Sequence, residues 1–153
     1  MATKEIEKFF FMAKGDKLYY KALRFSEVSE EWAQLHEMLM EAYIKGSAKA
    51  AYALGTWYLF GRYVKKNYKR AVDLLEYAAN EDVPLACYDL GVCYETGKGV
   101  AKDTQTAFKL YLKAALLGDK KSYQSVGRCY YYGIGIEKNR EVASIWLELS
   151  PQG

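Results

Sequence analysis

Cysteine, proline and histidine are scarce in this 153-residue sequence, with three, two and one copies. Three widely spaced cysteines do not make the disulfide framework of a small secreted protein, and no CxxC spacing indicates a zinc site. The sequence also lacks the apolar run of about 20 residues that a membrane-spanning helix needs, and its apolar segment 9–12 is too short for the core of a signal peptide. We therefore expect a cytoplasmic protein with no cofactor, no metal and no contact with a membrane.

An excess of charge of one sign is also missing. Lysine and arginine number 22, aspartate and glutamate number 19, and the net charge of +3 at pH 7 does not indicate a nucleic-acid partner. Positive charge does gather in one segment, at Arg62, Lys65, Lys66, Lys69 and Arg70. This segment is either a solvated loop or a contact for an anionic partner, whose attraction salt would screen.

Tyrosine and glycine, by contrast, are abundant, and they recur with a fixed period. A step of 36 residues links the glycines Gly55, Gly91 and Gly127 and the tyrosines Tyr58, Tyr94 and Tyr130. No insertion interrupts this register. A period between 20 and 50 residues is typical of stacked supersecondary units, so we expect a repeat protein.

Each unit contains two segments with helical periodicity, at residues 85–96 and 104–117 in the middle copy. Between them, Gly97 and Gly99 favour a tight turn, and Asp103 is placed to cap the second helix. Small residues such as Gly91 let the two helices approach closely. The sequence therefore predicts an all-α protein, an α/α superhelical solenoid of antiparallel helix pairs with a 36-residue repeat.

We predict one continuous domain with three full repeats, at 47–82, 83–118 and 119–153. Residues 1–46 are predicted to form N-terminal capping helices, in which 11–46 keep the length and hydrophobicity of a repeat without its glycines and tyrosines. A helical lead-in is expected at Ile6, Phe9, Phe10 and Ala13.

The segment 86–118 reads AxxxLGxxYxxGxGVxxDxxxAxxLYxKAAxxG. This pattern resembles the Sel-one-like repeat (SLR) family, relatives of the tetratricopeptide repeats, clearly over residues 47–153 and weakly over 11–46. The resemblance implies that the first helices of the repeats line a concave side that binds other proteins, in adaptors, scaffolds and assembly factors. One departure is Tyr63, which replaces the second turn glycine of the first repeat, so we expect this loop to be locally strained or reshaped.

By analogy with tetratricopeptide repeats, the groove-facing positions vary between repeats, and their aromatic and arginine residues are typical of binding hot spots. The predicted partner-binding residues are Tyr20, Arg24, Tyr52, Thr56, Phe60, Tyr88, Val92, Glu95, Lys121, Gln124, Arg128, Tyr131 and Tyr132. The same wall is expected to include Leu23, Lys49, Leu59, Leu85 and Thr96. The alternative is that these side chains only pack against neighbouring helices.

The last predicted helix is amphipathic, and no polar capping helix follows it. Its apolar residues are Val142, Ile145, Trp146 and Leu149. An uncovered apolar face usually marks an interface, so we expect self-association or partner docking there.

The function that best fits these observations is a non-enzymatic adaptor or scaffold that holds a protein or peptide partner in the groove. An alternative is an immunity protein that neutralises a toxin by binding it. A hydrolase is a third hypothesis, but it needs a nucleophile, a base and an oxyanion donor, and only three cysteines and the single histidine, His36, are available. We assign His36 no function.

Overall fold

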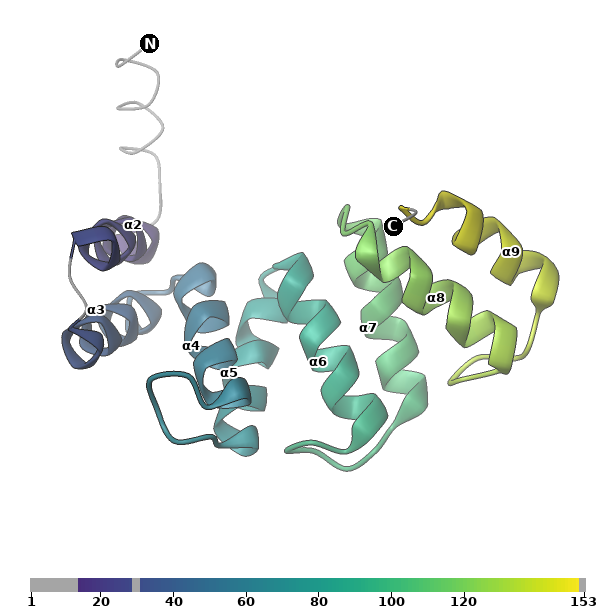
Figure 1. Cartoon of the computed structure of the whole chain (residues 1–153), viewed down its shortest axis with the longest axis horizontal. Helices are drawn as coiled ribbons and strands as arrows, with labels where there is room; N and C mark the ends of the chain where they lie inside the picture. Colours follow the sequence, from purple (N-terminus) through teal and green to yellow (C-terminus); the bar gives the residue numbers. More distant parts are fainter. Residues whose placement is uncertain (1–13, 29–30, 152–153) are drawn as a thin grey trace, which may run out of the picture.

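The computed structural model describes residues 14–28 and 31–151, and every regular element among them is an α-helix (Figure 1). The predicted all-α solenoid is confirmed, whereas the expected lead-in helix at residues 6–13 lies outside the described residues. The helices are α2 (Lys14–Val28), α3 (Trp32–Ile44), α4 (Ala48–Phe60), α5 (Tyr68–Asn80), α6 (Pro84–Thr96), α7 (Thr104–Leu116), α8 (Lys121–Tyr132) and α9 (Arg140–Leu149).

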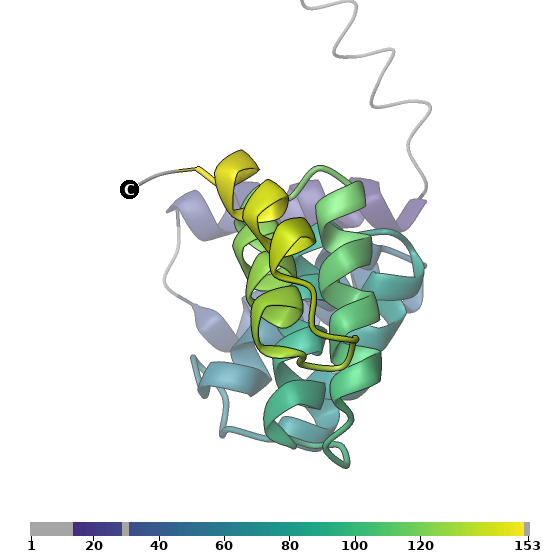
Figure 2. The same cartoon turned by 90° about the vertical axis from the view of Figure 1, so that its right-hand side faces the viewer.

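Consecutive helices pack as antiparallel pairs, α2 with α3, α4 with α5, α6 with α7 and α8 with α9. We call the first helix of each pair the A helix and the second the B helix. Each B helix also contacts the A helix of the next pair. In Figure 1, α2 and α3 are seen nearly end-on and α6 to α9 more from the side, and Figure 2 looks along the row from α9. The helix axes therefore turn along the array, which makes it a superhelix.

Short polar side chains start the B helices of the three repeats, as the sequence predicts. In each case the side chain accepts a hydrogen bond of 3.0–3.1 Å from the backbone N–H three residues later, at Asn67, Asp103 and Asn139. The preceding A helices end at glycines in the left-handed region, with φ of 66–73°, at Gly61, Gly97 and Gly133. These caps satisfy backbone groups that would otherwise lack partners, so each turn is fixed by local sequence.

Within each repeat, the A and B helices cross at a glycine. A Cβ atom on Gly91 would lie 2.8 Å from Cε1 of Tyr111, and one on Gly55 would lie 3.0 Å from Leu75. Such distances are shorter than ordinary van der Waals contact. The repeated glycine therefore sets the close approach of the two helices, and the large B-helix residue fills the space above it.

The first junction is built differently from the later ones. In the second repeat, a Cβ on Gly99 would lie 2.5 Å from the backbone oxygen of Tyr68, so only glycine permits that contact. Tyr63 holds the corresponding place in the first repeat with φ of 63°, a backbone conformation that is uncommon for residues other than glycine. Its ring stacks on Trp32 of α3, with the ring centroids 3.9 Å apart. An aromatic contact thus replaces backbone contact at this junction.

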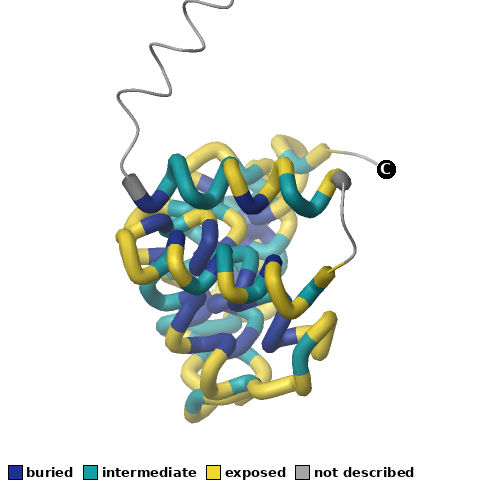
Figure 3. Tube along the Cα trace, turned by 90° about the vertical axis from the view of Figure 1, so that its left-hand side faces the viewer, coloured by how far each residue is buried: buried dark blue, intermediate teal, exposed yellow. Residues whose placement is uncertain are grey.

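The core lies between the A and B layers, where Figure 3 shows the buried positions gathered. Leu54, Leu75 and Tyr111 are among its largest fully buried side chains. All three cysteines are buried and free. Burial raises the pKa of Cys129 to about 11, so its thiol stays protonated at neutral pH. None of the helices in the described part of the chain is long and apolar enough to span a bilayer.

Candidate functional site

A cavity of about 290 Å³ opens between α4, the start of α5 and α6, and we call it the α4–α6 cavity. It is close in size to the smaller ligand pockets of proteins, about 300 Å³. Three of the predicted partner-binding residues, Phe60, Tyr88 and Val92, contribute to it, and Phe60 remains 65% exposed. The complete lining is Leu59, Phe60, Lys66, Tyr68, Tyr88, Asp89, Val92, Cys93 and Lys98.

The end of the α4–α6 cavity nearer the middle of α6 carries a partly buried carboxylate, that of Asp89. Burial raises the pKa of Asp89 to about 6, and the negative charge of Asp119 acts in the same direction. The Tyr52 hydroxyl acts on this carboxylate in the opposite direction, lowering its pKa, and partly offsets the effect. Burial, followed by the charge of Asp89, raises the pKa of Tyr52 to about 12, so the phenol keeps its proton.

Sequence reasoning missed Asp89, although one signal could have found it. The 36-residue step places Asp89 on Ala53 and Ser125, so an acidic residue stands where the other repeats have a small side chain. In addition, it follows a tyrosine that we assigned to the groove. A charged residue at a variable position beside a groove residue is a candidate for the groove itself.

The other end of the cavity is cationic. The ammonium groups of Lys66 and Lys98 lie 5.6 and 5.8 Å from the centroid of the Tyr68 ring, within the range of cation–π contacts. Neither lysine forms an ion pair with a carboxylate of the described residues. Cys93, about one helical turn after Asp89 on α6, also lines the cavity. Burial is the main cause of the raised pKa of its thiol, and Asp89 raises this pKa further while Lys98 lowers it.

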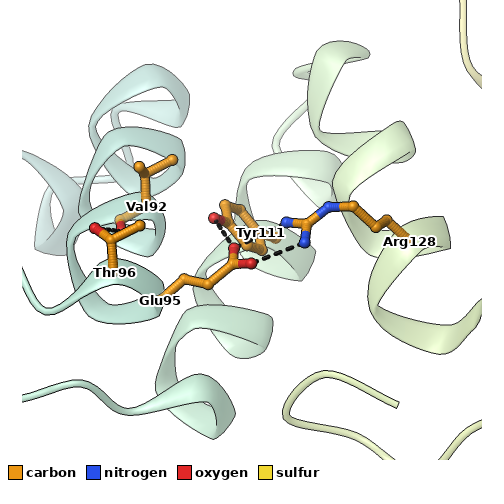
Figure 4. A network of polar contacts seen from close by, with 5 residues as sticks. All are labelled: Val92, Glu95, Thr96, Tyr111 and Arg128. Atoms are coloured by element: carbon orange, nitrogen blue, oxygen red, sulfur yellow. Dashed lines mark hydrogen bonds and ion pairs between the residues drawn. The ribbon is translucent and has the colours of Figure 1, made fainter. Parts of the chain in front are cut away.

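The next cleft along the wall, between α6 and α8, is closed by a polar network (Figure 4). Both guanidinium nitrogens of Arg128 donate to the carboxylate of Glu95 at 2.8 Å, and the Tyr111 hydroxyl donates to it at 2.6 Å. The Arg128 hydrogen bonds are the main cause of the low pKa of Glu95, and Tyr111 adds to it. Glu95 and Arg128, both predicted to bind a partner, therefore bind each other and tie α6 and α7 to α8.

Other predicted groove residues make contacts within the wall or face solvent. The Thr56 hydroxyl donates to the backbone oxygen of Ala53 at 2.7 Å, and Tyr20 accepts a 2.7 Å hydrogen bond from Lys49. Leu59 is only 9% exposed, so it belongs to the core as well as to the cavity lining. The exposed members of the predicted set are Arg24, Phe60, Lys121, Gln124, Tyr131 and Tyr132.

An aromatic pair stands at the end of the wall on α8. The rings of Tyr131 and Tyr132 meet edge-on, with their centroids 4.8 Å apart, and the Arg140 guanidinium lies 4.9 Å from the Tyr131 ring. Both tyrosines are exposed. This pair extends the aromatic surface past the closed cleft.

The predicted self-association face on α9 is only partly exposed. Ile145 and Leu149 are 57% and 59% exposed. Trp146 instead packs edge-on against Tyr123 of α8, with their ring centroids 5.6 Å apart, and Val142 is half-buried. Two of the four residues thus face solvent, while Trp146 belongs to the packing between α8 and α9.

His36 lies at the first junction, away from the α4–α6 cavity lining. Its Nε2 atom is 3.0 Å from the Tyr58 hydroxyl. Burial lowers the pKa of His36, and the positive charge of Arg70 lowers it further. The residues that the structure describes contain no group of three or more His, Cys, Asp or Glu side chains placed to hold a metal ion.

A row of antiparallel helix pairs with a 36-residue period and a cavity between its A helices defines a helical-repeat solenoid. The sequence matches the Sel1 repeat at residues 48–83, 84–119 and 121–150, so the chain belongs to the Sel1 repeat family. Proteins of this family generally mediate protein–protein interactions. No protein of curated function matches the sequence.

Solved structures share the fold. A Sel1 repeat protein from Oxalobacter formigenes has a TM-score of 0.83 and 24% identity, over 90% of this chain and 58% of that protein. A protective antigen of uropathogenic Escherichia coli with an SLR fold has a TM-score of 0.83 and 27% identity, over 96% and 31%. An immunity protein from Pseudomonas aeruginosa has a TM-score of 0.61 and 24% identity, over 90% and 53%. This chain therefore spans 31–58% of the length of these proteins.

Proposed function

We propose that this chain is a non-enzymatic adaptor or scaffold that holds a protein or peptide partner on the wall formed by its A helices. The observation that carries the proposal is the α4–α6 cavity, an apolar recess with the exposed ring of Phe60 at its edge. Exposed aromatic side chains beside a recess are typical of interaction hot spots. The stacked helices hold the recess open before a partner arrives, so binding loses little conformational entropy.

The opposite face of the array has a different character. Exposed positions of the B helices include the charged residues Asp73 on α5 and Lys109 on α7. Interface centres are depleted in such charged residues. The contrast supports the A-helix wall as the binding face and supplies control positions on the B-helix face.

Site-specific photocrosslinking in the native host tests this assignment. The photoreactive amino acid p-benzoylphenylalanine replaces Phe60 in one variant and Lys109 in the control, and mass spectrometry identifies the products. Both side chains are exposed, so neither replacement disturbs the core. We expect a specific crosslinked partner from position 60 and none from position 109.

Affinity measurements with the purified partner complete the test. We expect Phe60→Ala to weaken binding about tenfold or more, as truncation of an aromatic hot spot does, and Lys109→Ala to leave it unchanged. Equal crosslinking from both positions, or equal affinity of Phe60→Ala and wild type, contradicts a binding site on the A-helix wall.

A second candidate function is toxin neutralisation, because an immunity protein shares the fold. At 24% identity this likeness concerns the fold alone. The two functions separate in co-expression: an immunity protein restores growth to cells that make a toxin encoded beside its gene, and an adaptor does not.

Three further assignments belong to the same proposal. Residues 1–46 would cap the array, since α2 and α3 pack on α4. The cytoplasm would be its compartment, because the three thiols are free. Self-association would use Ile145 and Leu149, and Ile145→Asp would then convert a dimer to a monomer in light scattering. A mass of 17.5 kDa at high protein concentration excludes the dimer.

A further inference from the structure

The α4–α6 cavity has an apolar middle and two polar ends of opposite charge. Leu59, Val92 and the ring of Tyr88 provide apolar surface. Asp89 lies near the middle of α6, whereas Lys98 lies past the end of this helix and shares the Tyr68 ring with Lys66, so the opposite charges stand toward different ends of the cavity. A partner side chain that fills the middle must therefore be apolar. The residues beside it meet negative charge on one side and positive charge on the other.

The cationic end has an unused capacity for carboxylates. Lys66 and Lys98 both lie against the ring of Tyr68, which keeps their ammonium groups at the same end of the cavity. Within the described part of the chain, neither pairs with a carboxylate. Further exposed basic residues flank them in the two A-to-B turns and in the first turn of α5, at Arg62, Lys65, Lys69 and Lys102. This edge of the wall thus attracts negative charge. The apolar middle of the cavity also requires a partner side chain that fits it.

We infer that the partner is an acidic protein segment that places one large apolar side chain in the α4–α6 cavity and its carboxylates on Lys66 and Lys98. The inference rests on the proposed function, since it specifies the chemistry of the partner. Asp89 repels carboxylates at its own end, so the acidic residues lie on one side of the apolar anchor only. The sequence therefore encodes a contact for an anionic partner at this turn, and not only a solvated loop.

Nucleic acid is the other polyanion that lysines attract, but the cavity suits it less well. A phosphate chain carries charge on both sides of every base, and one side would meet Asp89. An acidic peptide can avoid this repulsion, because its charges need not surround the anchor. Binding of an oligonucleotide is therefore an outcome of the test that contradicts the inference.

Fluorescence anisotropy with short synthetic probes tests the inference on the full chain. Two peptides carry a phenylalanine with three acidic residues either before it or after it. One control peptide has alanine in place of phenylalanine, and another has asparagine and glutamine in place of the acids. A thymidine oligonucleotide with the same number of negative charges tests charge alone.

We expect one of the two acidic peptides to bind at least about tenfold more tightly than both peptide controls and the oligonucleotide. Binding should weaken as salt rises from 50 to 300 mM. The double variant Lys66→Gln, Lys98→Gln should lose several-fold affinity for that peptide, and the matched Lys109→Gln variant none. All three lysines are exposed, so these variants keep the fold.

Three results overturn the inference: equal binding of the amide peptide, equal binding of the oligonucleotide, or no effect of the double lysine variant. Failure of the acidic probes together with specific crosslinking at position 60 refutes the acidic partner and leaves the A-helix wall as the binding face. Failure of both experiments refutes the proposed function as well.

Discussion

The A-helix wall has two clefts between consecutive full repeats, with equivalent backbone positions but different side chains. Side chains bridge one cleft and leave the other open. Between α6 and α8, Glu95 and Arg128 span the cleft with two hydrogen bonds. One repeat earlier, the 36-residue step places Leu59 and Val92 at the same two positions. Two aliphatic side chains cannot bridge that distance, and both line the α4–α6 cavity.

The difference teaches that the repeated residues determine the positions of the helices, whereas the variable residues determine whether a cleft on the wall is filled or open to a partner. Long polar side chains fill one cleft and hold α6 and α8 in register. Short apolar ones leave the neighbouring cleft open and available to a partner. Of the two junctions between the three full repeats, the one between α6 and α8 thus stabilises the array and the one between α4 and α6 provides a recess.

The largest expected effect on stability comes from placing one residue of the Glu95–Arg128 pair at the equivalent position of the open cleft. Leu59→Glu puts a carboxylate at a position that is 9% exposed and has Val92, not an arginine, across the cleft, so we expect a loss of about 3 kcal/mol or more in the free energy of unfolding. Adding Val92→Arg should recover much of this loss by restoring the pair, and the double variant should bind no acidic peptide. Urea unfolding of both single variants and the double variant gives the coupling energy. Additive losses would show that the two clefts are not equivalent.

Asp89→Asn should have the next largest effect, and it should stabilise the protein. Since the pKa of Asp89 rises from 3.8 to about 6 on folding, its contribution to stability is present below pH 3.8 and is lost as the pH rises through 6. The neutral amide avoids this loss, so we expect a gain of roughly 2 kcal/mol at pH 7.5 and none at pH 3.5.

Urea unfolding at both pH values measures this difference. The groups that act on the Asp89 carboxylate are Tyr52 from α4 and Asp119 before α8. Lys66→Gln, which removes a charge at an exposed position of the same cavity, serves as the control. A gain that persists unchanged at pH 3.5 would assign the effect to something other than the charge of Asp89.

Arg128→Gln opens the closed cleft from its α8 side. The pair is only partly buried, with side chains 20% and 38% exposed for Glu95 and Arg128, so we expect a loss of about 1–2 kcal/mol at pH 7. Because Arg128 lowers the pKa of Glu95, its stabilisation is lost as the pH falls and Glu95 takes a proton. NMR titration of the Glu95 side chain should therefore find a higher pKa in the variant. An unchanged pKa would contradict the role of the pair.

Tyr111→Phe should have the smallest effect, about 1 kcal/mol, because it removes one hydroxyl that bonds Glu95 and keeps the buried ring. Thermal unfolding measures the loss. The control is the double variant with Arg128→Gln: the two losses should not add, since both changes act on one carboxylate.

The sequence predicted those features that obey local rules. Asn67, Asp103 and Asn139 as caps, and Gly91 at the helix crossing, follow from a backbone conformation that repeats every 36 residues. The Glu95–Arg128 pair could not be predicted in the same way. Periodicity placed both residues on the inner wall, but their contact depends on the distance between two A helices, which the spacing of residues does not report.

Asp89 shows a second limit. A carboxylate in a sequence is assumed to face water, because an uncompensated buried charge is costly. Its burial here depends on Tyr52 from the preceding repeat, so the partner is 37 residues away in the chain. Comparison of the equivalent positions in the three repeats, rather than inspection of a single helix, would have identified Asp89 as a candidate.

The stacking of Tyr63 on Trp32 has a consequence for how such a chain can lengthen. Duplication of a 36-residue unit between α5 and α6 would keep every backbone contact of the glycine-containing turns, since they touch main-chain atoms that any residue supplies. Duplication between α3 and α4 would separate the two rings. Lengthening of the array after α5 would thus leave the stack intact, whereas a unit inserted between α3 and α4 would have to replace it with another contact.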